Sequence, residues 1–195
     1  MSGSETSSSD DLLIRRAQKG EPGALEDLIR RHYGLIHRWA LVKTGDADDA
    51  EDVTQRVLIQ LFKKLGSFRG RSSFKSWLYR ITSNAAGEFH RRQGAREKAV
   101  SKWDEKQGRE SAEPEVLRRI GGSEAVEVAR AFFSELPERL REVFDLVELQ
   151  GYTATEAAEM LVMSPSTVRV HLLRARRTLR TRIMEQHPAL AEDFS

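Results

Sequence analysis

Residues 164–180 read SPSTVRVHLLRARRTLR, which places five arginines and no acidic residue in one stretch of a chain whose net charge is only +2. An α-helix turns by 100° per residue, so five apolar positions of this stretch and its continuation fall within about 80° of one another. These positions are Val168, Leu172, Ala175, Leu179 and Ile183. The stripe predicts a helix over 165–184 that packs one face on a core and turns its arginines outward.

The start of this helix is specified by Ser164, a good N-cap, and Pro165, which suits the first helical position. Just upstream, Thr153 and Glu156 have the spacing of a capping box and predict a short helix over 154–161. A short helix, a tight turn and a longer basic helix form a helix-turn-helix, whose second helix enters the major groove of DNA. A helical hairpin with a solvated basic face would give the same pattern, so both interpretations remain open here.

The rest of the chain is also patterned as helices. Helical periodicity predicts one helix from residue 10 to Gly20 and a second that ends at Gly45. Two more helices are predicted over 47–65 and 73–92. Beyond residue 123, helical segments are expected at 124–135 and 138–150. Nothing alternates like a strand, so the predicted class is all-α, with two small helical domains joined by a flexible linker. The expected boundaries are a disordered N-terminus over 1–9, a first domain over 10–93, a linker over 94–123, a second domain over 124–186 and a tail over 187–195.

Opposite charges are segregated along the chain. Residues 63–98 carry ten Lys or Arg and two acids, residues 124–159 carry nine acids and three arginines, and residues 169–182 carry six arginines and no acid. Two separate basic patches are typical of a protein that contacts a polyanion at two places, although solvated helix faces would look alike.

Several function classes are disfavoured. There is no cysteine for a disulfide or thiolate site, and the five histidines show no metal-ligand spacing. No glycine-rich phosphate loop occurs. We therefore expect no enzyme, no cofactor and no metal. No apolar run reaches the ~20 residues of a membrane span, and the first ten residues lack a signal-peptide core. We expect a cytoplasmic protein without membrane insertion.

The helix over 73–92 has an apolar stripe and, roughly 120° away, a polar face. The stripe contains Phe74, Leu78, Ile81, Ala85 and Phe89, and the polar face contains Arg80, Asn84, Gly87 and Arg91, with Trp77 between the two. A polar loop over 68–73 precedes it. Basic residues attract a nucleic-acid strand, and a loop beside aromatic side chains can hold an unstacked base. We interpret Phe74 as a core residue and Trp77 as partly core and partly binding.

The acidic run DADDAED over 46–52 lies where it would stabilise a helix N-terminus. In the helix that follows, Val53, Val57 and Leu61 are expected to face inward. The outward face is expected to hold Asp52, Gln55, Arg56, Ile59 and Lys63. An exposed isoleucine among polar residues suggests a protein contact.

Two long stretches resemble a known family. LPERLREVFDLVELQGYTATEAAEMLVMSPSTVRVHLLRARRTLR is similar to the region 4 domain of bacterial sigma factors, closest to the extracytoplasmic-function (ECF) group of the sigma-70 family. DADDAEDVTQRVLIQLFKKLGSFRGRSSFKSWLYRITSNAAGEFHRR resembles region 2 of the same group, and its FRG-x-SSF-x-x-WLYRI-x-x-N string is highly specific.

The resemblance implies a sigma factor that binds core RNA polymerase, at the β′ clamp helices and the β flap, and promoter DNA, with an anti-sigma factor as a further expected partner. It implies three sets of site residues. For the −35 element these are Ser166, Thr167, Arg169, Val170, His171, Leu173, Arg174, Arg177 and Arg180; residue type alone makes Arg176 a further candidate for a phosphate contact. For the −10 element and melting they are Phe68, Arg69, Gly70, Arg71, Ser72, Ser73, Lys75, Trp77, Arg80, Asn84 and Arg91. For polymerase they are Asp49, Asp52, Gln55, Arg56 and Ile59.

Three residues depart from the family pattern. Arg56 stands where an acid is usual, Val170 replaces a common serine on the DNA face, and Val162 occupies a turn position that is often glycine. If Val162 must be left-handed, it would be strained by ~1–2 kcal/mol, which favours a turn that differs from that of the family.

A stand-alone helix-turn-helix regulator is the alternative function. It would account for the second domain but leave the strand-binding pattern of the first unused.

Overall fold

The computed structural model describes residues 3–100 and 132–186, and within them every regular element is helical. The predicted all-α class is confirmed. The chain divides into two compact units, one of residues 1–40 and 50–105 and one of residues 41–49 and 106–195. The predicted domain boundaries stay predictions. In the ranges that the structure describes, no helix is both long and apolar enough to cross a membrane.

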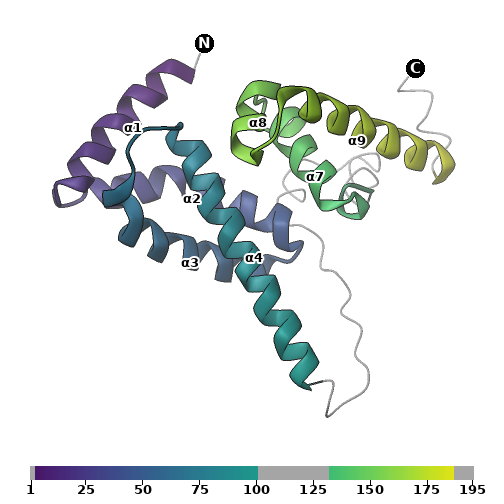
Figure 1. Cartoon of the computed structure of the whole chain (residues 1–195), viewed down its shortest axis with the longest axis horizontal. Coiled ribbons are helices and arrows are strands. Elements are labelled where there is room, and N and C mark those ends of the chain that lie inside the picture. The colour runs from purple at the N-terminus through teal and green to yellow at the C-terminus, as the bar shows by residue number, and fades with distance from the viewer. Residues whose placement is uncertain (1–2, 101–131, 187–195) are drawn as a thin grey trace. The chain divides into compact units, whose positions relative to one another are not determined.

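The first unit is built on α1 (Gly3–Gln18), most of α2 (Ala24–Thr44), most of α3 (Ala47–Lys64), the 3-10 turn η1 (Leu65–Ser67) and α4 (Phe74–Val100) (Figure 1). Every residue of the two predicted apolar stripes, on α3 and on α4, is buried. Trp39 of α2 packs edge-on against Tyr79 of α4, with 5.2 Å between ring centroids. The hydrophobic periodicity therefore predicted the inward faces of these helices correctly.

Two ends of the first-unit helices differ from the prediction. Helix α1 begins at Gly3, whereas we expected disorder over 1–9; serine is a moderate helix former, so its run can continue a helix that later packs Leu13 and Ile14. Helix α4 continues to Val100 through the expected linker start at Gly94. The residues AREKAV that follow are mostly good helix formers and offset the single glycine.

The second unit contains a helical turn at 132–135, α7 (Glu138–Phe144), the π-helical turn η2 (Asp145–Leu149), α8 (Ala154–Leu161) and α9 (Pro165–Gln186). Its core joins Phe133 and Leu136 to Ala175 of α9. The predicted helix over 138–150 thus ends in a π turn, in which the Gln150 N–H donates to the Asp145 carbonyl at 3.0 Å. The predictions for 101–131 and 187–195 lie outside the described residues.

Candidate nucleic-acid interface

The helix-turn-helix predicted over α8 and α9 is present, with the predicted caps. The Glu156 N–H donates to Thr153 Oγ1 at 3.2 Å, and the Thr153 N–H donates to Glu156 Oε2 at 2.8 Å, which completes the capping box. At the start of α9, the Thr167 N–H donates to Ser164 Oγ at 3.1 Å. The two caps define where each helix begins, and therefore which residues lie at the N-terminus of α9.

The turn between α8 and α9 contains a left-handed residue, Val162, although valine disfavours that conformation. Val162 has φ 55° and ψ 54°, and the Met163 N–H donates to the Ala158 carbonyl at 3.0 Å, which is the pattern of a Schellman motif. Val162 is 76% exposed, so contacts of its own side chain do not offset the strain of this conformation. The turn is therefore left-handed at Val162, at the cost of backbone strain.

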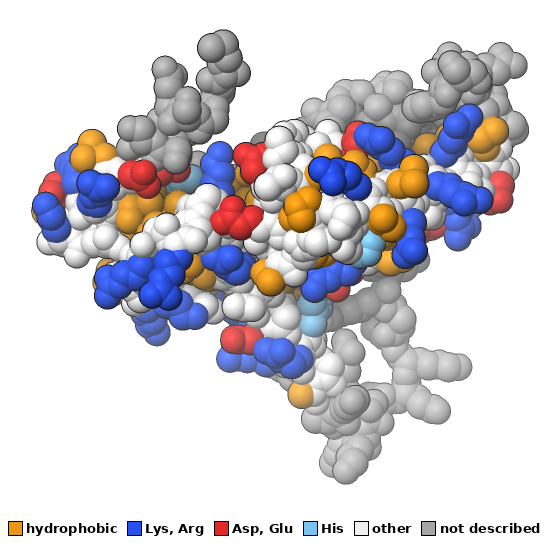
Figure 2. Space-filling model, turned by 45° about the horizontal axis from the view of Figure 1, so that its top comes forward, with side chains coloured by type: hydrophobic (Ala, Val, Ile, Leu, Met, Phe, Trp, Pro, Cys, Tyr) orange, Lys and Arg blue, Asp and Glu red, His pale blue; other side chains and the backbone are white. Residues whose placement is uncertain are grey.

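Helix α9 separates an inward apolar stripe from an outward basic face. Val168 and Ala175 are fully buried, and the other three members of the predicted stripe are half-buried. The outward side chains that the sequence predicted are exposed: Ser166, Arg169, Val170, Leu173, Arg174, Arg177 and Arg180. In Figure 2, basic and hydrophobic side chains alternate over the right-hand part of the surface, where α9 runs.

The outward face of α9 is not purely basic. Leu173 is 67% exposed and Val170 is 47% exposed, so two apolar side chains lie between the arginines. Thr167 and His171 are half-buried. Arg176 differs from the other arginines because it pairs with Glu148 of η2, an interaction that the sequence did not predict.

In the first unit, three aromatic rings gather beside the loop of residues 68–73. The Phe68 ring centroid lies 5.1 Å from that of Trp77 and 5.5 Å from that of Phe74. Phe74 is buried, as predicted for a core residue, whereas Phe68 and Trp77 are half-buried. The rings of Phe68 and Trp77 are therefore partly open to solvent beside the loop.

The loop itself is held by polar contacts to α4. The Arg80 guanidinium donates to the Ser72 hydroxyl, and the Ser76 N–H donates to Ser73 Oγ at 3.1 Å. Gly70 has φ 67°, a left-handed conformation that favours glycine. Among the other predicted −10 residues, Arg69, Arg71, Asn84 and Arg91 are exposed and Lys75 is half-buried.

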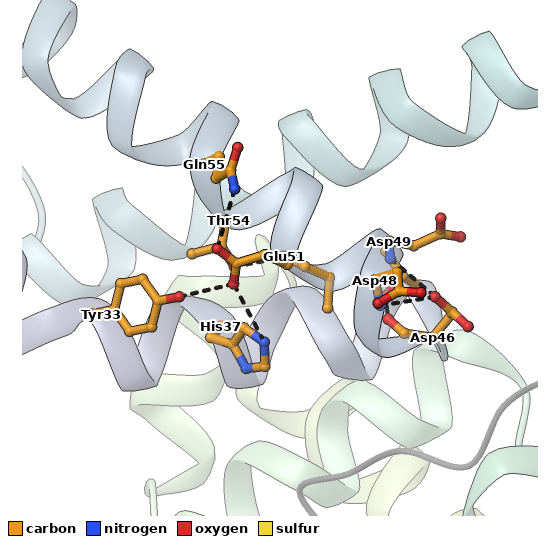
Figure 3. Close-up of polar contacts among 10 residues, drawn as sticks. Tyr33, His37, Asp46, Asp48, Asp49, Glu51, Thr54 and Gln55 are labelled. Atoms are coloured by element: carbon orange, nitrogen blue, oxygen red, sulfur yellow. Dashed lines mark hydrogen bonds and ion pairs between the residues drawn. The ribbon is translucent and has the colours of Figure 1, made fainter.

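The N-terminus of α3 is capped by Asp46, whose Oδ1 accepts from the N–H groups of Asp48 and Asp49 at 3.0 Å each (Figure 3). A structural role for the acidic run is thus supported. One turn further, Glu51 accepts from the Tyr33 hydroxyl at 2.8 Å and from Gln55 at 3.3 Å, as Figure 3 shows. The hydrogen bond to Glu51 raises the pKa of Tyr33.

The exposed face of α3 differs from the prediction at two residues. Asp52, Gln55, Ile59 and Lys63 are exposed as expected, but Arg56 is half-buried, with its guanidinium carbon 5.1 Å from the ring centroid of Phe89. The sequence analysis missed Phe62, which is 72% exposed, and Ile59 is 55% exposed. Because residues three apart share a helix face, Ile59 and Phe62 form one apolar patch. This spacing was the signal that could have revealed it.

A buried polar cluster was also missed. Asp10 of α1 lies 2.7 Å from Arg31 Nη1 and 3.1 Å from His32 Nε2, and both Asp10 and His32 are buried. Desolvation lowers the pKa of His32 below its usual value, against the opposing effect of Asp10. The described residues contain no group of side chains suited to a metal ion.

Comparison with known proteins assigns both units to one family. Residues 28–96 match the family model for Sigma-70 region 2, and residues 127–179 match that for Sigma-70, region 4. The chain is 32% identical to the ECF RNA polymerase sigma factor SigM of Mycobacterium tuberculosis over 171 residues, which is 88% of this chain and 83% of that protein. It is 32% identical to the ECF RNA polymerase sigma-E factor of Escherichia coli K12 over 186 residues, which is 89% of this chain and 94% of that protein.

A solved structure has a similar fold. The sigma factor RpoE of Bartonella quintana, determined in complex with the anti-sigma factor NepR, superposes with a TM-score of 0.62 at 21% identity, covering 85% of this chain and 99% of that one. That likeness concerns the fold, whereas the two family-model matches and the two relatives establish the family. The chain belongs to the extracytoplasmic-function group of the sigma-70 family of RNA polymerase sigma factors.

Proposed function

We propose that this sigma factor binds core RNA polymerase and directs it to promoters by reading a −35 element with α9 and a −10 element with the loop of residues 68–73 and α4. One observation carries the proposal. The two surfaces that are basic and suited to nucleic acid belong to separate compact units, and each lies in the segment that matches the corresponding sigma region. We propose domain boundaries of 10–93 for the first and 124–186 for the second, with α1 and α4 extending beyond the first domain at its two ends.

For the −35 element, the N-terminal half of α9 is proposed to enter the major groove. The exposed guanidinium groups of Arg169 and Arg174 can each donate two hydrogen bonds to O6 and N7 of guanine. Arg177 and Arg180, further along the helix, are proposed to meet phosphates. Ser166, Thr167 and His171 complete the polar part of the contact, and Val170 and Leu173 supply its apolar part.

For the −10 element, we propose that the half-buried rings of Phe68 and Trp77 stack with an unpaired base that the loop receives. Arg69, Gly70, Arg71, Ser72 and Ser73 form the loop, and Lys75, Arg80, Asn84 and Arg91 lie along α4 to meet the strand. Removing a base from the duplex costs a few kcal/mol, and base–aromatic stacking offsets about 1–3 kcal/mol of this.

Protein partners are proposed for the first unit's α3. Asp49, Asp52, Gln55 and Ile59 would contact the β′ clamp helices, with Phe62 widening the apolar part of the contact. Arg56 would support this face from its position on Phe89. The β flap would bind the second domain. Because the related RpoE was solved with an anti-sigma factor, we propose such a partner here as well. The chain would act as a non-catalytic subunit, in the cytoplasm where polymerase works.

The experiment compares duplex binding by the protein alone with binding in the presence of core polymerase. Two weak DNA contacts on one scaffold gain strength through effective concentration, so core polymerase should strengthen promoter binding by orders of magnitude. Tight, sequence-specific duplex binding by the protein alone, unchanged by core polymerase, would favour the stand-alone regulator and contradict the proposal.

A further inference from the structure

The last residue of α1 contacts the loop that is proposed to receive the −10 base. Gln18 Nε2 donates to the carbonyl of Leu65 and to the carbonyl of Phe68, both at 2.9 Å. Gln18 lies ten residues before the segment that matches Sigma-70 region 2, which begins at residue 28. The contact therefore links a helix outside that match to the start of the loop.

These two carbonyls lie at the two ends of the η1 turn. The Leu65 carbonyl already accepts from the Phe68 N–H at 3.0 Å, so Gln18 reinforces the same turn from outside. Phe68 itself is extended, with φ −66° and ψ 122°. A carboxamide that bridges both carbonyls restricts how Phe68 leaves the turn, and hence where its ring lies relative to Trp77, 5.1 Å away.

Helix α1 is itself anchored, so Gln18 is not on a loose end. Asp10 is buried against Arg31 and His32 of α2. The His32 ring contacts the Phe74 ring edge-on, with 5.2 Å between centroids, and Phe74 packs in turn on Phe68. At its other end, α1 terminates in a Schellman motif in which the Glu21 N–H donates to the Arg16 carbonyl at 3.1 Å.

We propose that Gln18 is a positioning residue for −10 recognition: it holds the 68–73 loop and the Phe68 ring in the orientation that accepts the base. The inference rests on the proposed function of that loop. Gln18 needs no contact with DNA for this role, because it acts through the backbone of residues 65–68.

The test uses the full chain with Gln18→Met, which has a similar size and no charge but cannot donate. The matched control is Gln60→Met, the same chemical change at a residue whose side-chain oxygen accepts only a helix-surface hydrogen bond from Lys64. Gln18→Lys restores a donor of sufficient reach. In the free protein, an arginine-specific protease reports the loop through cleavage after Arg69 and Arg71, both exposed.

Loss of the two hydrogen bonds should raise cleavage at the loop by roughly two- to tenfold in Gln18→Met, and not in Gln60→Met. Gln18→Lys should return the rate toward that of the wild type. Equal acceleration at arginines throughout the first unit would mean general unfolding and would overturn the inference, as would unchanged cleavage in the loop.

With core polymerase, the readout is the ratio of initiation rates from two promoters that differ at one −10 base. If the variant only had a smaller fraction of correctly folded protein, both initiation rates would fall by the same factor and their ratio would not change. A displaced loop changes the ratio, by roughly two- to tenfold. An unchanged ratio beside faster loop cleavage would overturn the positioning role. Absence of initiation by the wild-type protein would overturn the proposed function instead, while the cleavage rates would still decide the contact.

Discussion

The ring of Phe68 packs against the ring of Trp77 at a centroid distance of 5.1 Å and an angle of 52°, at the point where the 68–73 loop meets α4. Both rings are half-buried, and the buried Phe74 supports them from the core side. Phe74 thus holds the Phe68 and Trp77 rings in place from the core side, and the exposed parts of these two rings can bind without disturbing the core. The first prediction depends on this difference between the buried Phe74 and the partly exposed Trp77.

Trp77→Ala should impair promoter opening more than −35 binding. Loss of one stacking partner is expected to cost about 1–3 kcal/mol in open-complex formation. Permanganate reactivity of −10 thymines measures the opening. A promoter already mismatched over the −10 element should restore most of the activity, and Asn84→Ala should behave in the same way. If the mismatched promoter rescues neither variant, the melting role is wrong for these residues.

Arg169→Ala should weaken binding to the −35 element by about 1–3 kcal/mol and relax the base preference at one position. Arg180→Ala should weaken binding to all sequences alike and reduce the salt slope by about 1. Arg176→Ala is the matched control, because Arg176 is paired with Glu148. Holoenzyme binding to a −35 variant library, measured at two salt concentrations, checks all three. Equal effects of Arg169 and Arg176 would contradict the assignment.

Leu173 is predicted to contact the methyl group of a −35 thymine, since its exposed apolar side chain lies between arginines on α9. Replacing that thymine by deoxyuridine removes only the methyl group and should weaken binding by about 0.8 kcal/mol. In Leu173→Ala the same replacement should have almost no further effect, because the two changes remove one contact. The same comparison with Val170→Ala tests whether Val170 contacts a thymine methyl group. Additive losses at every thymine would exclude both contacts.

Val162→Gly should stabilise the second unit. The left-handed conformation of valine is strained by about 1–2 kcal/mol, and glycine's greater unfolded-state freedom takes back about 0.4–1 kcal/mol. The expected net gain is therefore between about 0 and about 1.6 kcal/mol, with a midpoint of about 0.8 kcal/mol. Hydrogen exchange of the α8 amides measures it in the intact chain. Faster exchange in the glycine variant would show that valine stabilises the turn by some other means.

Stability of the first unit should fall as the pH drops below the ordinary pKa of histidine. Burial lowers the pKa of His32 in the folded state, with Lys75 and Arg31 acting in the same direction and Asp10 against them. Below about pH 6.5 the unfolded chain therefore binds more protons than the folded one, and the free energy of unfolding decreases until the folded pKa is passed. Urea unfolding between pH 7.5 and 5.5 should show a smaller decrease for His32→Gln than for the wild type. His90→Gln, at an exposed residue of α4, is the control; equal decreases in all three proteins would contradict the prediction.

The sequence predicted what local spacing encodes. The stripe of α9, the capping box at Thr153 and the cap at Ser164 each depend on residues within a few helical turns, and all are confirmed. The fold class followed from the same periodicity.

Apart from Phe62, whose spacing from Ile59 is local, what the sequence analysis missed depends on pairs that are distant in the chain. Arg56 lies on Phe89, Asp10 on His32 and Gln18 on Phe68, and no spacing rule connects residues that far apart. Val162 is a local feature that the sequence analysis did not predict correctly. Valine disfavours the left-handed conformation, which favoured a different turn, yet Val162 is left-handed in the structure.

The central claim is that this chain directs polymerase to a two-part promoter. Run-off transcription with purified protein and bacterial core RNA polymerase, on a pool of genomic fragments with RNA 5′ ends mapped, tests it most directly. The account predicts discrete starts, preceded by a shared −10 motif and a shared −35 motif at constant spacing, and loss of the −35 motif's influence in Arg169→Ala. No initiation above that of core polymerase alone would contradict it.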